Sequence, residues 1–277
     1  MDPSILQLIH AAIAEDVGPG DVTCQYFVSE SLESQAKIVA RESGVMAGGD
    51  IAETVFREVG GSTVTMRLAD GDAFSPGDVL LEAKGKTRAL LTAERTALNF
   101  LQRLCGVATM ARTYVEAVKP HPVEVWDTRK TTPGWRLIEK AAVKSGGAVN
   151  HRMGLYDHVM VKDNHLAADD SLERLQDGID LVRKERPGVR IQIEAATLQQ
   201  VADFLSLRNV DMLLLDNMTI AQLRHAVEIV DGRVWLEASG GITLKTIKDV
   251  AATGVNAISV GALTHSARAL DLGLDLF

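Results

Sequence analysis

The stretch VDMLLLD, residues 210–216, decides the fold of this chain. It is a short apolar run that ends in a carboxylate, which is typical of a buried parallel strand. Comparable runs occupy residues 189–193, 234–236 and 257–260, and the four runs end near residues 194, 216, 238 and 260, a spacing of 22 residues each time. This spacing suits one strand, one loop and one helix of about two to three turns, so the sequence predicts a (β/α) barrel.

Two further apolar runs precede these four, at Val123–Trp126 and His158–Val161. Six strands are fewer than the eight of a complete barrel. The stretch from Thr131 to Asn150 is too polar and too rich in glycine to place another strand. The sequence therefore predicts a barrel that is incomplete.

The first third of the chain has a different pattern. Apolar and polar residues alternate at Ala36–Ala40, Thr63–Leu68 and Val79–Glu82, with glycine-rich turns between them, which predicts a small antiparallel sheet. A helical pattern follows from Thr87 to about Lys119, and Gly106 is expected to break it into two helices.

The predicted class is therefore α/β with two domains. Residues 1–108 form an N-terminal α/β sandwich with a helical joint, and residues 109–277 form the incomplete barrel. The last residues are expected to pack back on the N-terminal domain.

Composition excludes several classes of protein. A formal net charge of −8 argues against a nucleic-acid binder, whose affinity would come from Lys and Arg. The two cysteines, Cys24 and Cys105, have no partners at metal-ligand spacing and indicate neither a zinc site nor a disulfide framework. The N-terminus lacks the pattern of a signal peptide, and no apolar run approaches the roughly 20 residues that span a membrane. A cytoplasmic protein is expected.

Polar residues follow every predicted barrel strand. The active sites of such barrels lie at the C-terminal ends of the strands, so these residues are expected to meet at one mouth. They are Asp127-Thr128-Arg129-Lys130, Lys162-Asp163-Asn164-His165, Glu194, Asp216-Asn217, Ser239-Gly240-Gly241 and Gly261-Ala262.

The basic residues near the mouth point to an anionic ligand. Arg129, Lys130, His151, Arg152 and Lys162 lie within 34 positions of a negatively charged chain. The alternative is that each is a solvated surface group in an ion pair. Their common position beside strand ends favours the ligand, a molecule with several negative charges.

Glycines and carboxylates complete the predicted mouth. The loops at Ser239-Gly240-Gly241 and Gly261-Ala262 follow the last two strands, where barrels often bind phosphate, although glycines also serve ordinary turns. Glu194 and Asp216 suit sugar hydroxyls, a developing positive charge or a divalent metal, or else they only neutralise nearby cations.

Lys162 has a competing interpretation as a Schiff-base lysine of an aldolase. Several neighbouring cations serve a polyanionic substrate more directly than they serve a single imine.

These residues resemble a known family, the quinolinate phosphoribosyltransferases, also called carboxylating nicotinate-nucleotide pyrophosphorylases. The resemblance runs along nearly the whole chain and rests on a series of motifs in order. They are Glu15-Asp16 through Gly20-Asp21-Val22-Thr23, Leu91-Thr92-Ala93-Glu94-Arg95-Thr96-Ala97-Leu98-Asn99, Asp127-Thr128-Arg129-Lys130-Thr131-Thr132-Pro133-Gly134, Gly146-Gly147, Asn150-His151-Arg152, Gly154-Leu155-Tyr156-Asp157, Lys162-Asp163-Asn164-His165, Leu215-Asp216-Asn217, Ser239-Gly240-Gly241 and Val260-Gly261-Ala262-Leu263-Thr264.

The resemblance implies a fold and an assembly. It implies an N-terminal sandwich, a barrel of seven strands and a homodimer, which can assemble further. It also implies that Arg95 reaches into the active site of the partner subunit, a role that spacing does not reveal.

The resemblance also implies the reaction and the role of each residue. Phosphoribosyl pyrophosphate and quinolinate would give nicotinate mononucleotide, pyrophosphate and carbon dioxide in NAD biosynthesis, with Mg²⁺ bound to the pyrophosphate and not held firmly by the protein. Lys130, Glu194 and Asp216 would be catalytic. Thr128, Arg129, Lys130, His151, Arg152, Lys162 and Arg95 of the partner would bind substrate, Glu194 and Asp216 would bind the ribose, and Ser239, Gly240, Gly241, Val260, Gly261 and Ala262 would bind the 5′-phosphate.

Two positions depart from the family pattern. Trp135 stands where a smaller aliphatic residue is usual, and Gln192 stands where an acidic residue is common. Two rival functions are a paralogous group associated with molybdenum transport operons and a regulatory barrel without catalysis. The intact motifs at Asn150–Arg152 and Lys162–His165 favour quinolinate over the first, and Lys130, Glu194 and Asp216 argue against the second.

Overall fold

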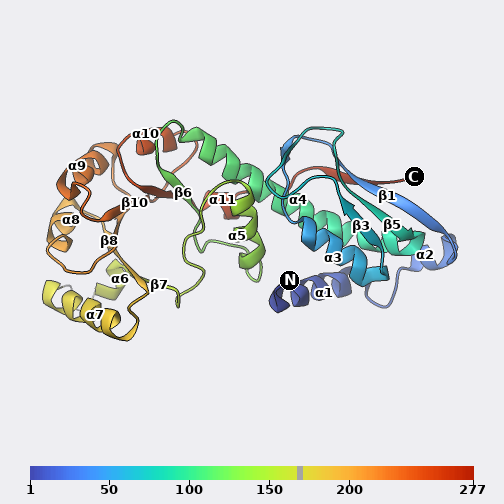
Figure 1. Cartoon of the computed structure of the whole chain (residues 1–277), viewed down its shortest axis with the longest axis horizontal. Helices are drawn as coiled ribbons and strands as arrows, with labels where there is room; N and C mark the ends of the chain where they lie inside the picture. The colour runs from blue at the N-terminus through green and yellow to red at the C-terminus, as the bar shows by residue number, and fades with distance from the viewer. Residues whose placement is uncertain (167–170) are drawn as a thin grey trace. The chain divides into compact units, whose positions relative to one another are not determined.

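The computed structural model describes residues 1–166 and 171–277, and these divide into two compact units (Figure 1). Unit 1 comprises Met1–Arg112, Thr131–Gly147 and Leu263–Phe277, and unit 2 comprises Thr113–Lys130 and Ala148–Ala262. The predicted boundary between residues 108 and 109 falls inside one helix, α4 (Thr87–Ala117).

Unit 1 is built on an antiparallel sheet. Its strands lie in the order β12 (Leu272–Leu276), β1 (Glu33–Ala40), β5 (Val79–Lys86) and β3 (Thr63–Met66). The end of the chain thus returns to pair with β1, with Leu276 opposite Ala36 and Leu272 opposite Ala40.

Helices cover the buried side chains of this sheet. Alternate residues of β1 are buried, as expected for a strand with one face toward the core. Helix α3 (Gly49–Gly60) buries Ile51, Val55 and Phe56 and contacts β3 and β5. The other elements of unit 1 are α1 (Pro3–Val17), α2 (Val22–Phe27), β2 (Gly44–Val45), β4 (Ala73–Phe74) and α5 (Arg136–Ser145).

Helix α4 continues through Gly106, so the predicted break at this glycine is wrong. The glycine is needed for packing. A Cβ atom placed on it would lie 1.8 Å from the carbonyl oxygen of Arg268. The segment after α11 (Ala262–His265) therefore passes against the helix backbone, and Leu270 donates its N–H to the carbonyl of Gln102.

Unit 2 is the incomplete barrel. The fold class is confirmed, and each of the six predicted strands is present in one parallel sheet. The order is β6 (Glu124–Trp126), β11 (Ala257–Ser259), β10 (Trp235–Ser239), β9 (Met212–Asp216), β8 (Arg190–Ala195) and β7 (His158–Val161). The helices that alternate with the strands are α6 (Asp163–Leu166), α7 (Leu172–Glu185), α8 (Leu198–Phe204), α9 (Ile220–Val230) and α10 (Ile247–Ala251).

Capping residues fix where the barrel helices begin. Thr197 and Thr219 each accept a hydrogen bond from the backbone N–H of the third residue of the helix, a glutamine. The side-chain oxygen of that glutamine accepts the backbone N–H of the threonine. In Figure 1, α8 and α9 lie on the outer side of strands β8 and β10.

A seventh position extends the sheet beyond β6. Val149 forms an isolated parallel bridge to Trp126, donating its N–H to Val125 and accepting from Asp127. A bridge of one residue leaves no period-2 pattern, which explains why no strand is predicted between Thr131 and Asn150.

The interior of the barrel is packed and not a channel. Trp126, Met212 and Ala257, from β6, β9 and β11, form one buried cluster. Among the described residues, no helix is both long and apolar enough to cross a membrane.

The close approach at Gly106 yields a stability test. We expect Gly106→Ala to lower the free energy of unfolding by about 1–3 kcal/mol, because the new methyl group must displace the Arg268 backbone. The matched control is Gly178→Ala, inside α7, where an added Cβ meets nothing within 4 Å. That variant should gain about 0.5–1 kcal/mol from helix propensity. Urea and thermal unfolding measure both changes, and equal stabilisation by the two variants would contradict the packing role.

Candidate active site

The predicted mouth residues of unit 2 lie at the C-terminal ends of neighbouring strands. Asp216 of β9 is in register with Ser239 of β10, and Glu194 lies near the end of β8 beside Leu214 of β9. Val260 follows β11 and donates its N–H to Trp126 of β6. Parallel strands thus bring carboxylates and glycine loops from distant positions to one edge.

Lys162 and Glu194 form an ion pair at this edge. Lys162 follows β7, and its Nζ lies 2.5 Å from Oε2 of Glu194. The Lys162 side chain is 39% exposed and the Glu194 side chain 11%. The ion pair foreseen as an alternative role for Glu194 is therefore present, and an anionic ligand of Lys162 must compete with this carboxylate.

The loop after β10 depends on its glycines. Gly240 has a φ of +99°, and an added Cβ would lie 2.2 Å from Oδ1 of Asn217. Asn217 in turn donates its backbone N–H to Ser239 and its side-chain amide to Asp216. Gly241 also has a positive φ, and nothing lies within 4 Å of its Cβ position. The backbone at Gly241 is thus open to a ligand.

Two guanidinium groups lie close enough to repel each other. Burial, followed by the charge of Arg129, lowers the pKa of Arg152. Arg152 is half-buried and donates to the carbonyl of His158. Thr128 shapes the same loop as Arg129 by accepting the N–H of the exposed Lys130. Two neighbouring cations, one of them partly desolvated, favour an anion at this position.

His151 differs from the other predicted basic residues. It is buried, its Nδ1 accepts the N–H of Arg152 at 2.7 Å, and its Nε2 lies 3.1 Å from Oε2 of Glu237. Because a backbone N–H can only donate, Nδ1 carries no proton, and the ring is the neutral Nε2–H tautomer. The ring therefore adds no positive charge to the mouth in this arrangement.

The structure adds three buried polar residues that the sequence did not assign to the site, Gln192, His158 and Glu237, and shows the contact of a fourth, Asp127, that it did place at the mouth. Asp127 accepts the backbone N–H of His151 at 2.8 Å, and the amide of Gln192 donates to Glu237 at 2.7 Å. The rings of His158 and His151 lie 5.4 Å apart. Burial lowers the pKa of His158 to about 4, so this ring is neutral at pH 7. The signal for these residues is a polar side chain inside an apolar strand run.

The two unusual positions have different surroundings. Gln192 is fully buried inside the barrel as described above. Trp135 belongs to unit 1 and stacks on Phe100, with ring centroids 4.8 Å apart. Trp135 thus packs the segment before α5 against α4.

Arg95 and the second glycine loop complete the predicted set. Arg95 lies on α4 in unit 1, where it is exposed between buried Ala93 and Ala97. Val260 is buried, and Gly261 and Ala262 follow it at the strand end. The predicted roles of these residues stay predictions.

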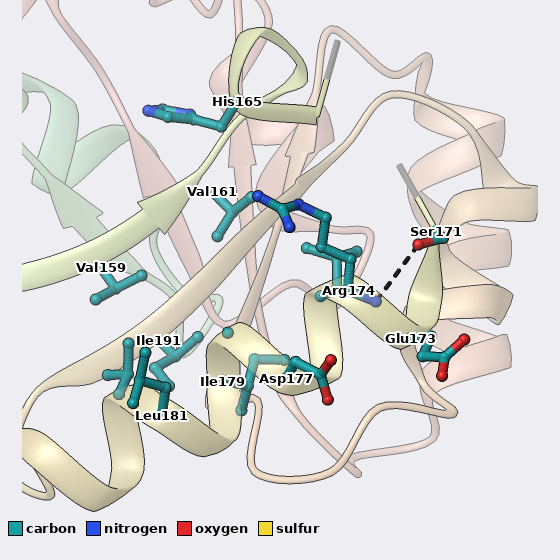
Figure 2. Close-up of a pocket in the computed structure, with 13 residues that line it drawn as sticks. Val159, Val161, His165, Ser171, Glu173, Arg174, Asp177, Ile179, Leu181 and Ile191 are labelled. Atoms are coloured by element: carbon teal, nitrogen blue, oxygen red, sulfur yellow. Dashed lines mark hydrogen bonds between the residues drawn. The ribbon is translucent and has the colours of Figure 1, made fainter. Parts of the chain in front are cut away.

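A cavity of about 660 Å³ in unit 2 is lined by His165 of the predicted mouth, by α7 and by residues of β7 and β8. Figure 2 shows that α7 forms one wall of it, with Val159, Val161 and Ile191 of β7 and β8 opposite. These residues alternate with His158, Met160 and Gln192, so they lie on the outer face of the sheet. Apart from His165, none of the residues that line the cavity belongs to the predicted site.

The residues at the strand ends that could bind a metal ion are the carboxylates Glu194 and Asp216. Among residues 1–166 and 171–277, no group of three or more His, Cys, Asp or Glu side chains could hold a metal ion. Glu194 and Asp216 remain as single carboxylates on adjacent strands. Mg²⁺ usually keeps several waters and binds through one or two carboxylates together with substrate phosphates, so these two residues fit such an ion.

Family models match both parts of the chain. The model "Quinolinate phosphoribosyl transferase, N-terminal domain" matches residues 21–105, and the model for the C-terminal domain of the same family matches residues 107–275.

Relatives of known name match over almost their full lengths. Quinolinate phosphoribosyltransferase [decarboxylating] 1 of Nicotiana glauca is 37% identical over 97% of this chain and 81% of its own. The crystal structure of NadC from Streptococcus pyogenes is 38% identical, with a TM-score of 0.93, over 100% of this chain and 99% of that one. Nicotinate-nucleotide pyrophosphorylase from Francisella tularensis is 33% identical, with a TM-score of 0.92, over 100% and 98%. The chain belongs to the quinolinate phosphoribosyltransferase family.

Proposed function

We propose that this chain transfers the phosphoribosyl group of phosphoribosyl pyrophosphate to quinolinate and releases carbon dioxide, giving nicotinate mononucleotide and pyrophosphate for NAD biosynthesis. The observation that carries this proposal is the pair of neighbouring guanidiniums, Arg129 and Arg152, in a chain of net charge −8. Such a pair is stabilised by a ligand with more than one negative charge. Quinolinate, a pyridine dicarboxylate, is such a ligand.

Quinolinate would lie among the basic residues of the mouth. Arg129, Arg152 and Lys162, together with Arg95 of the partner subunit, would hold its two carboxylates, and His151 would border the same pocket. Bidentate guanidinium contacts fix the plane of a carboxylate and so orient the pyridine ring. Lys162 would leave its ion pair with Glu194 and pair with a carboxylate of the substrate. Orientation is then the main contribution of these groups to the rate.

Phosphoribosyl pyrophosphate would lie along the strand ends of β8 to β11. Glu194 and Asp216 would accept hydrogen bonds from the ribose hydroxyls. The 5′-phosphate would bind Ser239, Gly240, Gly241, Val260, Gly261 and Ala262, where the open backbone at Gly241 supports close approach. Thr128 and Lys130 would lie between quinolinate and the pyrophosphate, since both follow β6 beside β11.

The reaction follows from these positions. As the bond between ribose C1 and the pyrophosphate oxygen breaks, positive charge develops on the ribose, and Glu194 and Asp216 stabilise it. The pyridine nitrogen then forms the new bond to C1. The resulting pyridinium accepts the electron pair of the adjacent carboxylate as carbon dioxide leaves, and a proton from solvent replaces it on the ring. No general base is needed.

Mg²⁺ is the proposed cofactor. Bound to the pyrophosphate, it would neutralise the negative charge of the leaving group. Glu194 and Asp216 are the protein oxygens that would lie nearest to it.

Two other functions fit the observations less well. An aldolase needs a lysine whose amine can attack a carbonyl, whereas the Nζ of Lys162 lies 2.5 Å from Oε2 of Glu194. A regulatory barrel would bind phosphate without needing Glu194, Asp216 or Lys130. The assay with quinolinate below distinguishes the proposed function from that of the paralogues associated with molybdenum transport operons.

The reaction is tested by mixing the chain with quinolinate, phosphoribosyl pyrophosphate and Mg²⁺. We expect nicotinate mononucleotide and carbon dioxide in equal amounts, measured by chromatography and by release of labelled carbon dioxide. Nicotinate, which lacks one carboxylate, is the matched control and should react far more slowly. Equal rates with nicotinate would contradict the dicarboxylate pocket.

A homodimer with shared active sites is also proposed. Arg95 is exposed on α4, and α2 of the same unit exposes Val22, Tyr26 and Phe27, which are 65%, 82% and 86% accessible. Exposed apolar side chains of this size favour contact with another subunit. A second copy of the chain would then complete each site, and light scattering measures the size of the assembly.

Mixed dimers test the shared site. Arg95→Ala and Lys130→Ala subunits should each be nearly inactive, because every site then lacks one of the two groups. A mixture of equal parts, refolded together, should recover about a quarter of the wild-type activity, since half of the dimers contain one intact site. No recovery from mixtures that contain heterodimers would contradict the role of the partner's Arg95.

A cytoplasmic location is proposed from the cysteines. Cys24 and Cys105 are both buried and unpaired, as is usual in a reducing compartment. Cell fractionation in the source organism would test this location.

A further inference from the structure

A layer of buried polar side chains lies inside the barrel, beneath the mouth. His151, His158, Gln192 and Glu237 are 7%, 3%, 0% and 0% exposed. They come from the loop after Val149 and from strands β7, β8 and β10, yet His151 and Gln192 both contact one oxygen, Oε2 of Glu237. Contacts between strands that are not neighbours require these side chains to point into the barrel.

Glu237 is the acceptor at the centre of this layer. Burial by itself would raise the pKa of Glu237, whereas the hydrogen bond from His151, any positive charge on that ring and the hydrogen bonds from Ser259 and Gln192 lower it. Oε2 of Glu237 accepts from the His151 ring and the Gln192 amide, as a carboxylate does, while His158 is neutral and the Nδ1 of His151 accepts from Arg152. The layer carries one negative charge, and this charge favours the cationic form of Arg152.

The His151 ring links this carboxylate to the mouth. Its Nε2–H donates to Glu237, and its Nδ1 accepts the backbone N–H of Arg152. A second anchor holds the backbone of His151 on Asp127. If the ring lost its acceptor, the Nδ1–H tautomer would become accessible, and that tautomer cannot accept the N–H of Arg152.

We propose that Glu237 is a positioning residue which, with the amide of Gln192 beside it, fixes the tautomer of His151 and thereby holds Arg152 next to Arg129 at the mouth. The proposal rests on the proposed function, since it assigns Arg152 to the dicarboxylate. Gln192 has a specific part in it. An amide can only donate to Glu237 through its nitrogen and adds no charge, whereas a second carboxylate 2.7 Å away would have to share a proton with it.

The main test is Glu237→Gln, which keeps the shape of the side chain and removes its charge. We expect the KM for quinolinate to rise on the order of 10-fold or more, because the Arg152 loop loses its anchor, while the KM for phosphoribosyl pyrophosphate changes little. The ring ¹⁵N signals of His151, assigned by their loss in His151→Asn, should depart from those of the Nε2–H tautomer.

The matched control is Glu228→Gln on α9. Glu228 also pairs with a histidine, His225 at 3.3 Å, but this pair is exposed on the surface of the same unit. The control should leave both KM values unchanged. An unchanged KM for quinolinate in Glu237→Gln, equal to that of the control, would overturn the proposal.

A second variant, Gln192→Glu, keeps the test valid if Glu237→Gln does not fold. At low pH the two carboxyl groups share a proton and mimic the wild-type hydrogen bond, so the KM for quinolinate should be near the wild-type value. At higher pH the shared proton is lost, and the KM should rise in a titration that the wild type lacks. The charged and titratable groups around the pair are His151, Arg152, His158 and Arg190. A pH profile identical to that of the wild type would overturn the proposal.

The two proposals can fail separately. If the wild type makes no nicotinate mononucleotide, the proposed function is wrong, and the ¹⁵N signals of His151 still test whether Glu237 fixes its tautomer. If the wild type is active but Glu237→Gln keeps both its KM and its ring signals, only the positioning role is wrong.

Discussion

Burial of the Glu237 carboxylate inside the barrel is the constraint on which the site depends. A buried charge is costly unless hydrogen bonds satisfy it, and here the ring of His151 and the amide of Gln192 donate to the same oxygen. Because the Nε2–H of His151 donates to this carboxylate, the Nδ1 of the ring is an acceptor. Nδ1 accepts the backbone N–H of Arg152 and so holds that backbone in place. The two hydrogen bonds that this core carboxylate accepts thus help to position the backbone of Arg152 at the mouth.

The mouth itself combines charges that repel one another without ligand. The charge of Arg129 acts on Arg152, and Lys162 forms an ion pair with Glu194. In the proposed reaction these groups meet carboxylates that offset their charge, and Glu194 becomes available to the ribose. The strand ends hold the residues in place, so that little reorganisation accompanies the reaction.

Much of this arrangement could be predicted from the sequence. The six barrel strands were recognised because each is a continuous apolar run, as expected for strands buried on both faces. Residues such as Glu194 and Asp216 were assigned to one mouth because parallel strands carry their C-terminal ends to one edge. Both the apolar runs and the polar residues that follow them are local patterns, so they can be recognised in the sequence without a structure.

The remaining features depend on contacts between distant residues. Gly106 resembled a helix break, but the approach of the Arg268 backbone explains it within a continuous helix. The bridge at Val149 is too short to leave a pattern. Glu237, Gln192 and His158 were missed because a polar residue in a strand usually faces water, and only the closure of the sheet places these three inside. The acceptor role of the His151 Nδ1 follows from one backbone hydrogen bond, which cannot be predicted from composition or from a count of charges.

A crystal structure of the chain with quinolinate tests the central assignment most directly. We expect the two carboxylates on Arg129, Arg152 and Lys162, with Lys162 released from Glu194 and with Nδ1 of His151 still accepting the N–H of Arg152. Quinolinate bound elsewhere, or at the mouth with Lys162 still paired to Glu194, would contradict the assignment.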